Sequence, residues 1–192
     1  MTKAATQAVK KKPSAAITDP GDFLSSVKTI RARARKHIEE GAMTGDYKLN
    51  AKAAVKVLND ALATELVCTL RYRQHSFVAK GINADPIAQE FMVHSNEELA
   101  HADLIAKRIV QLGGDPEFNP DILMQKSHAE YVTCDKLEDM IRENLVAERI
   151  AIESYREMIL YFAEHDPTTR VMLEGILAME EEHADELADL LH

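Results

Sequence analysis

Apolar residues recur every three to four positions in four long stretches of the chain, which is the spacing of one face of an α-helix. The pattern predicts long helices over about residues 51–80, 85–113 and 135–164, and a fourth from residue 166 nearly to the end. Glycine follows the first two stretches, and Asp-Pro opens the second and fourth, as is typical of helix boundaries. The expected capping residues are Asn50, Asp85, Asp135 with Glu138 at capping-box spacing, and Asp166.

Short loops join the first predicted helix to the second and the third to the fourth, and short loops make antiparallel neighbours. The link at residues 113–134 is long, contains Pro116 and Pro120, and has room for a short helix at 122–126. At about 3.3 Å per extended residue, this link can run the length of a bundle of about 40 Å. We therefore predict an all-α fold, a four-helix bundle of two hairpins joined by one long crossover.

The residues before this bundle differ from it in composition. Residues 1–20 have the composition of a flexible basic tail, with small residues and a run of three lysines. Residues 21–50 form a predicted N-terminal helical extension, with a short helix from about Asp22 to Glu40. The apolar face of that helix is expected to contain Phe23, Val27, Ile30 and Ile38.

Composition limits the classes of protein to which the chain can belong. It has 192 residues, of which 46% are hydrophobic, with only 7 Gly and 6 Pro, and this favours a helical domain with an appendage. No apolar run reaches the roughly 20 residues of a membrane span, and the N-terminus lacks the apolar region of a secretory signal. Two cysteines make neither a disulfide framework nor a four-thiolate metal site. We expect a cytoplasmic protein with no membrane partner.

The net charge of −9 is unevenly divided along the chain. Residues 1–50 carry ten Lys and Arg against five Asp and Glu, whereas the remainder carries 13 against 27. A basic arm therefore precedes an acidic body. The body would attract cations and repel nucleic acid, and the arm could do the reverse.

Glutamate stands three residues before histidine near the middles of the second and fourth predicted helices. The two pairs are Glu98 with His101 and Glu180 with His183. Residues three apart lie on one helix face, close enough to bind the same metal ion. A single pair of this kind is common on surface helices, but two pairs at matched positions indicate a metal centre.

Each hairpin also has a glutamate in the middle of its first helix, Glu65 in "ALATELVCTL" and Glu148 in "NLVAERIAI". A carboxylate on an apolar stripe is costly to bury without a partner. These glutamates precede the two Glu-x-x-His motifs by 33 and 32 residues, and a tyrosine follows each by seven. The chain therefore looks like a duplicated hairpin with a pseudo-twofold axis. Salt bridges from each glutamate to Arg71, Arg149 or a histidine are the alternative.

The charges of these groups indicate the kind of metal. Four carboxylates and two neutral imidazoles carry a total charge of −4, which two divalent ions would neutralise. Without such ions, close like charges would raise the carboxylate pKa values. Oxygen-rich ligation with one imidazole per metal suits Fe²⁺ or Mn²⁺ better than a closed zinc site.

This residue set resembles the ligands of the ferritin superfamily, and the di-iron centre of bacterioferritin most closely. Its members are Glu65, Glu98, His101, Glu148, Glu180 and His183. The segments "ALATELVCTLRYRQH" and "NEELAHADLIAKRIVQLGG" look like the first two bacterioferritin helices, and the resemblance covers about residues 51–192. It implies a ferritin-like four-helix bundle with two iron ions per subunit. It also implies that Tyr72 orients a ligand carboxylate, with a half-buried core tyrosine as the alternative.

Differences from bacterioferritin bear on the haem and the assembly. Leu99 occupies the position of its haem-ligating methionine, so no haem is expected. The chain ends at His192 without a fifth helix, which is similar to Dps-like proteins of 12 subunits; a 24-subunit shell is the alternative. A full ligand set within one such subunit resembles the thioferritin group, which has a cysteine pair near its site. Cys68 should lie near the ligands and Cys134 far from them, which favours two free, buried thiols.

Residues beside the motifs have expected positions as well. His94 lies on the same stripe as Glu98, where a place at the edge of the core is favoured over one beside the metals or on an iron entry route. Glu97, Glu181 and Glu182 are expected to face solvent or neighbouring subunits.

The resemblance to Dps-like proteins implies a DNA contact for the basic tail. Its lysines would each bind phosphate weakly but would act together over many tails of one shell, whereas a purely solubilising tail is the alternative. These lysines are Lys3, Lys10, Lys11 and Lys12.

Taken together, the sequence predicts a ferroxidase that oxidises Fe(II) with O₂ or H₂O₂ and stores ferric mineral in a hollow homo-oligomer. Two alternatives remain open at this point. One is a di-iron peroxide reductase of the rubrerythrin type, without a shell; the other is a DNA-compacting structural protein.

Overall fold

A computed structural model of the chain describes residues 24–192, so the predicted tail at residues 1–20, its four lysines and Phe23 lie outside the described residues. The described part consists of helices and loops, and the prediction of an all-α fold is confirmed. Its elements are α1 (Val27–Arg33), the 3₁₀ helix η2 (Ile38–Glu40), α2 (Ala51–Val78), α3 (Ala84–Gln111), α4 (Pro120–Lys126), α5 (Leu137–Phe162) and α6 (Pro167–Asp189).

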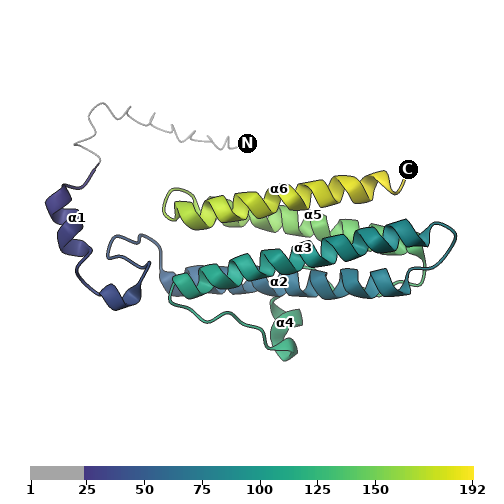
Figure 1. The fold of residues 1–192 in the computed structure, drawn as a ribbon, viewed down its shortest axis with the longest axis horizontal. Helices are drawn as coiled ribbons and strands as arrows, with labels where there is room; N and C mark the ends of the chain where they lie inside the picture. Colours follow the sequence, from purple (N-terminus) through teal and green to yellow (C-terminus); the bar gives the residue numbers. More distant parts are fainter. Residues whose placement is uncertain (1–23) are drawn as a thin grey trace, which may run out of the picture.

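The four long helices lie side by side as two antiparallel hairpins, α2 with α3 and α5 with α6 (Figure 1). The link from α3 to α5 runs outside the bundle and includes α4, which lies beside α2 (Figure 1). Leu123 of α4 packs against Ala63 and Val67 of α2. The long crossover and its short helix are therefore as predicted, with α4 beginning two residues earlier than expected.

Two of the predicted helix caps are confirmed. The Asn50 side chain accepts a hydrogen bond from the backbone N–H of Ala53, 3.1 Å away, at the start of α2. The Asp166 side chain accepts one from the N–H of Thr169, 3.0 Å away, at the start of α6, where Pro167 occupies the first helical position. In both cases a side-chain oxygen satisfies a backbone donor that has no partner within the helix.

The other two predicted caps are wrong. Helix α3 begins at Ala84, so Asp85 lies inside its first turn, where a negative charge interacts favourably with the helix dipole. Helix α5 begins at Leu137 without a side-chain cap, so Asp135 and Glu138 do not form a capping box. An acidic residue is favourable anywhere in the first turn of a helix, so its position in the sequence does not identify the first helical residue.

The single helix predicted over Asp22–Glu40 is also wrong, because α1 covers only seven residues and η2 follows separately. Between them His37 has a left-handed backbone with φ of 52°, which interrupts the helix. Val27, Ile30 and Ile38 are 61%, 49% and 75% exposed, respectively. The expected apolar face is therefore exposed on the single chain.

Asp166 joins three parts of the structure. Its carboxylate accepts hydrogen bonds from the Tyr47 hydroxyl of the N-terminal extension (3.0 Å) and from the Arg108 guanidinium at the end of α3 (2.9 Å), in addition to capping α6. The Asp166 side chain is buried. A buried, multiply bonded carboxylate requires its donors in place, so this contact sets the end of α3 against the start of α6.

Apolar packing is concentrated toward the two ends of the bundle. At one end the core contains Leu58, Leu62, Ile105, Phe162 and Leu173. At the other end it contains Phe91, Met140, Ile141 and Leu187. The middle of the bundle between these clusters is occupied by polar side chains. Within residues 24–192, the helices lack the long apolar window that a membrane crossing requires.

Candidate metal centre

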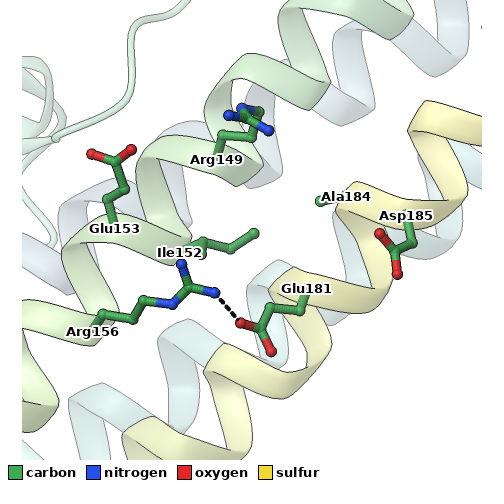
Figure 2. A pocket seen from close by; sticks show the side chains of 7 residues that line it. All are labelled: Arg149, Ile152, Glu153, Arg156, Glu181, Ala184 and Asp185. Carbon is green, nitrogen blue, oxygen red and sulfur yellow. Dashed lines mark hydrogen bonds and ion pairs between the residues drawn. The ribbon is translucent and has the colours of Figure 1, made fainter.

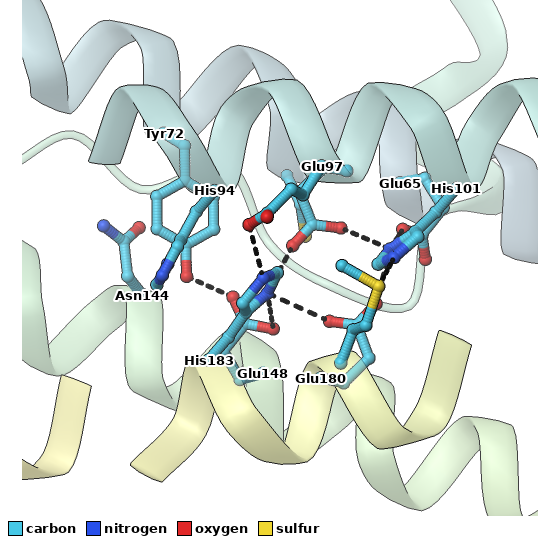
Figure 3. Close-up of polar contacts among 12 residues, drawn as sticks. Glu65, Tyr72, His94, Glu97, His101, Asn144, Glu148, Glu180 and His183 are labelled. Atoms are coloured by element: carbon cyan, nitrogen blue, oxygen red, sulfur yellow. Dashed lines mark hydrogen bonds and ion pairs between the residues drawn. The ribbon is translucent and has the colours of Figure 1, made fainter. Parts of the chain in front are cut away.

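Each of the four long helices places one glutamate in the middle of the bundle. Glu65 comes from α2, Glu98 from α3, Glu148 from α5 and Glu180 from α6. All four are 1% exposed. The two predicted histidines, which are 2–3% exposed, lie among them (Figure 3). The structure thus brings together all six side chains that the sequence singled out.

The six side chains form two overlapping groups of ligand atoms. In the first group, one atom from each residue lies within 4.8 Å of the others; its members are Glu65, Glu98, His101 and Glu180. In the second group the same holds for Glu98, Glu148, Glu180 and His183. Glu98 and Glu180 belong to both groups. The geometry therefore fits two metal subsites that share two carboxylates and have one imidazole each.

The Nδ1 atom of each histidine faces the carboxylates. His101 Nδ1 lies 3.0 Å from Glu180, 3.3 Å from Glu65 and 3.6 Å from Glu98. His183 Nδ1 lies 3.6 Å from Glu98 and 3.9 Å from Glu180. Both Nδ1 atoms and several facing carboxylate oxygens are buried without a hydrogen-bond partner. Since buried polar atoms are nearly always paired, this donor set fits a cation.

Salt bridges to Arg71, Arg149 or a histidine are the alternative role for the two mid-helix glutamates. Arg71 is buried, but its guanidinium donates to the side chain of Asn144 (3.0 Å) and to the Glu130 carbonyl (2.8 Å). Arg149 lies on the surface, beside a cavity between α5 and α6 (Figure 2). Among the described residues, neither arginine forms an ion pair with Glu65 or Glu148. Each glutamate instead lies beside a histidine, as part of that alternative had it: Glu65 is 3.3 Å from His101 and Glu148 is 4.0 Å from His183.

The two hairpins support each other's carboxylates through tyrosines. The Tyr72 hydroxyl of α2 donates to Glu148 of α5, and the Tyr155 hydroxyl of α5 donates to Glu65 of α2. Tyr72 is fully buried and touches a predicted ligand, which excludes the half-buried position given as its alternative. Each tyrosine lies seven residues, or two helical turns, after the glutamate of its own helix. It therefore bonds the glutamate of the other hairpin and not that of its own helix.

The outer nitrogens of the two histidines have different partners. His183 Nε2 lies 3.0 Å from a carboxylate oxygen of Glu97, whereas His101 Nε2 lies 3.4 Å from the thioether sulfur of Met179. Glu97 and Met179 each directly precede the ligand glutamate of their helix, so the duplicated hairpin places them at equivalent positions. A carboxylate is a far stronger acceptor than a thioether, and it raises the basicity of a ligating imidazole.

The expectation that Glu97 faces solvent is therefore wrong in part. Its side chain is 37% exposed, but its carboxylate reaches from α3 to His183 of α6. The sequence contains a signal for this role, since Glu97 occupies the position that Met179 has in the other half. Glu181 and Glu182 do lie on the surface, and Glu181 pairs with Arg156 (Figure 2).

His94 and the cysteines also have defined places. The His94 side chain is fully buried rather than at the core edge, and its ring stacks on that of His183 with centroids 4.1 Å apart. Cys68 and Cys134 are both free thiols, as expected, but Cys134 is only half-buried. Burial raises the pKa of the Cys68 thiol, so it is protonated at neutral pH.

Burial and mutual repulsion hold protons on the carboxyl groups of the metal-free site. Burial, with the neighbouring charge of Glu98, raises the pKa of Glu65 to about 8. The same two causes raise the pKa of Glu148 and of Glu180. Burial also opposes the charge on Glu98, but the two neighbouring imidazoles outweigh burial and lower the pKa of Glu98.

The imidazoles respond in the opposite sense. Burial lowers the pKa of His101, but contacts with Glu65 and Glu98 outweigh burial and raise it to about 10. For His183, burial is likewise outweighed, chiefly by Glu98 and Glu148, and the pKa rises to about 9. Both imidazoles are therefore protonated at neutral pH, and a metal ion must displace protons from this site.

Most of the chain is similar to known proteins. A family model described as a ferritin-like domain matches residues 55–192. The chain is 30% identical over 140 residues to the bacterioferritin of Mycobacterium leprae, covering 69% of this chain and 80% of that protein. It is 29% identical over 143 residues to a nutrient stress-induced DNA-binding protein of Synechococcus, covering 70% of this chain and 78% of that protein.

A solved structure is similar over the same region. It is a dodecameric thioferritin, the bacterioferritin-related protein of Bacteroides fragilis, with a TM-score of 0.72 and 34% sequence identity. The match covers 75% of this chain and 87% of that one.

Metal affinity should increase with pH. Because pKa values of Glu65, His183 and His101 are raised to about 8, 9 and 10, these groups hold protons at pH 7 that a metal must displace. Each displaced proton gives about a tenfold increase in Zn²⁺ affinity per pH unit between pH 6 and 8. Calorimetry in two buffers of different ionisation enthalpy counts these protons. Zn²⁺ binding without proton release would contradict this account of the site.

Replacing Glu97 by glutamine should weaken one subsite selectively. The substitution removes the charge that makes His183 a better ligand, and loss of such a partner typically lowers metal affinity about 10- to 100-fold. A two-step Co²⁺ titration followed by absorbance should show one weakened step and one unchanged step. Glu182→Gln on α6, an exposed glutamate next to His183, is the matched control. Equal weakening of both steps would show that Glu97 does not act through His183.

Proposed function

The chain belongs to the ferritin-like domain family, and on that premise we propose that it is a di-iron ferroxidase that stores iron. Its substrate is Fe²⁺, its oxidant is O₂ or H₂O₂, and its product is ferric mineral inside a hollow homo-oligomeric shell. The observation that carries this proposal is the pair of overlapping ligand groups sharing Glu98 and Glu180. Two shared carboxylates hold two metal ions close enough to give up two electrons to one oxidant molecule.

The residues have distinct roles in this proposal. Glu65 and Glu148 are the outer carboxylates, and the tyrosines of the opposite hairpins hold them in place. The Nδ1 atoms of His101 and His183 supply the nitrogen ligands. Carboxylates tolerate changes in metal charge because they can bind through one oxygen or two.

The charge of the site accounts for the binding of Fe²⁺ and the release of Fe³⁺. Four carboxylates neutralise two Fe²⁺ ions, so ferrous iron is held without excess charge in the buried interior. Two Fe²⁺ ions supply the two electrons that, with two protons, convert H₂O₂ into two water molecules or O₂ into H₂O₂. The two Fe³⁺ ions then carry two positive charges that the carboxylates do not balance. Burying uncompensated charge is costly, which favours release of ferric iron to hydrolysis and mineral growth.

The assembly that we propose is a shell of twelve subunits, with 24 as the alternative. It is supported by the similarity to a dodecameric thioferritin at 34% identity. A non-shell peroxide reductase would have the same metal ligands but the mass of a monomer or dimer. Native mass therefore separates the two functions.

Removing a shared ligand should abolish ferroxidase activity. Glu98→Ala and Glu180→Ala each take one carboxylate from both subsites, so Fe²⁺ oxidation should fall at least about a hundredfold. The measurement is the rate at which ferric absorbance appears after anaerobic Fe²⁺ loading and addition of oxidant. Glu182→Ala, an exposed change on the same helix as Glu180, should keep the native rate.

The number of subunits can be measured on the same protein preparations. Twelve copies of the 21.5 kDa chain have a mass of about 260 kDa, which native mass spectrometry resolves from a dimer. Native oxidation rates in both alanine variants would overturn the ferroxidase assignment. A dimeric particle with active oxidation would instead favour the peroxide reductase.

DNA binding by the N-terminal tail is a second proposal, supported by the similarity to a DNA-binding protein of Synechococcus and by four tail lysines. Deleting residues 1–20 should reduce retardation of duplex DNA in a gel, and salt should reduce retardation by the intact protein because phosphate contacts release counterions. Equal retardation of DNA by the intact and the shortened protein at low salt would exclude a role of the tail in DNA binding.

A further inference from the structure

Polar side chains continue beyond the candidate metal centre toward the side of the bundle formed by α3 and α6. His94 Nε2 lies 3.0 Å from a carboxylate oxygen of Glu186 and 3.5 Å from one of Glu90. One ligand atom from each of these three residues lies within 4.8 Å of the others. His94 comes from the middle of α3, Glu90 from one turn earlier, and Glu186 from the end of α6.

The histidine at this cluster is not a surface residue. His94 is fully buried, and its Nδ1 has no hydrogen-bond partner. By contrast, the side chains of Glu90 and Glu186 are 39% and 45% exposed, so they reach the surface while the imidazole lies beneath them. The nitrogen that faces both carboxylates is Nε2, which lies within hydrogen-bonding distance of Glu186, so a cation at this cluster would replace that contact. One nitrogen and two carboxylates are ligands of the kind that Fe²⁺, Mn²⁺ and Zn²⁺ accept.

Solvent reaches this cluster through a cavity of about 530 Å³ between the start of α3 and the end of α6. Its lining within residues 24–192 is partly apolar, with Pro86, Ile87 and Leu190, and its charged members are all acidic: Glu90, Glu186 and Asp189. Among the described residues, Glu90 and Glu186 form ion pairs with His94 alone. The charge at the cavity is therefore negative, which attracts cations, and the cavity has room for the water molecules that complete a metal's coordination.

The cluster occurs in only one half of the duplicated hairpin. His94 precedes the ligand Glu98 by four residues, and the equivalent residue before Glu180 is Ile176, which is buried in the apolar core. The residues equivalent to Glu90 and Glu186 are apolar as well, namely Met172 and Leu104. The four-helix fold therefore does not require polar residues at these three positions, because the equivalent positions in the other half are apolar.

We propose that Glu90, His94 and Glu186 form a third divalent-cation site, through which Fe²⁺ passes from the cavity to the neighbouring metal centre. The distance to that centre is short, because the rings of His94 and His183 are stacked 4.1 Å apart (Figure 3). In addition, one atom each of His94, Glu148 and His183 lies within 4.8 Å of the others. The passage of iron rests on the proposed ferroxidase function, whereas cation binding at the third site does not.

Anomalous diffraction from crystals of the full assembly soaked in Zn²⁺ tests the binding site without redox chemistry. We expect three zinc peaks per subunit in the native protein, two at the centre and one between Glu90, His94 and Glu186. The double variant Glu90→Gln/Glu186→Gln should lose the third peak and keep the other two. The control Glu153→Gln/Glu174→Gln removes the same charge from two exposed positions and should keep all three.

Two outcomes would overturn the third site. One is a native protein with no third peak when the centre is saturated with zinc; the other is a third peak that survives in the double variant. The native crystal alone can reject the proposal, so it remains testable even if the double variant fails to fold.

Oxidation kinetics test the passage of iron. At low Fe²⁺ concentration the double variant should load and oxidise iron several-fold more slowly than the native protein, with the rate at saturating Fe²⁺ unchanged. An unchanged rate at low Fe²⁺ would overturn the passage role. If the native protein oxidises no Fe²⁺, the ferroxidase proposal fails, and the zinc peaks still decide whether the third site exists.

Discussion

Four carboxylates meet in the interior of this bundle, and the cost of placing them there governs much of the surrounding structure. Each would be ionised in water at neutral pH, and an unpaired charge in a protein interior costs several kcal/mol. Two imidazoles, two tyrosine hydroxyls and bound protons compensate the charges in the metal-free protein. Two divalent cations would compensate them more completely. The charge of the site therefore favours the binding of cations.

The apolar ends of the bundle make this polar middle possible. The cluster around Leu58 and Phe162 closes one end, and the cluster around Phe91 and Leu187 closes the other. Both exclude water and hold the helices at fixed spacing, so that side chains from four helices reach a common point. Asp166 sets the end of α3 against the start of α6, which keeps Glu98 and Glu180 at the same depth. The position of the centre thus depends on packing and polar contacts at some distance from it.

The duplicated hairpins are equivalent in their ligands and different in their surroundings. Glu97 and Met179 occupy matched positions, yet one presents a carboxylate and the other a thioether to the outer nitrogen of a histidine. One turn further out, His94 corresponds to the core residue Ile176. Each difference makes the surroundings of His183 more polar than those of His101. The two subsites are therefore chemically distinct, and the acidic cavity lies beside only one of them.

The sequence by itself determined the helices of the bundle, its connectivity and the six candidate ligands. Helical periodicity is local, so a spacing of three residues places Glu98 and His101 on one face, and equal spacings in two hairpins place Glu65 and Glu148 at equal depth. Contacts between helices are not local. The pairing of Tyr72 with Glu148, the reach of Glu97 to His183 and the burial of His94 all depend on which faces of different helices meet. The N-terminal helix also departs from its pattern, because Val27 and Ile30 have the period of a buried face but are exposed on the single chain. Periodicity identifies which side of a helix is apolar, and only the tertiary structure decides what that side contacts.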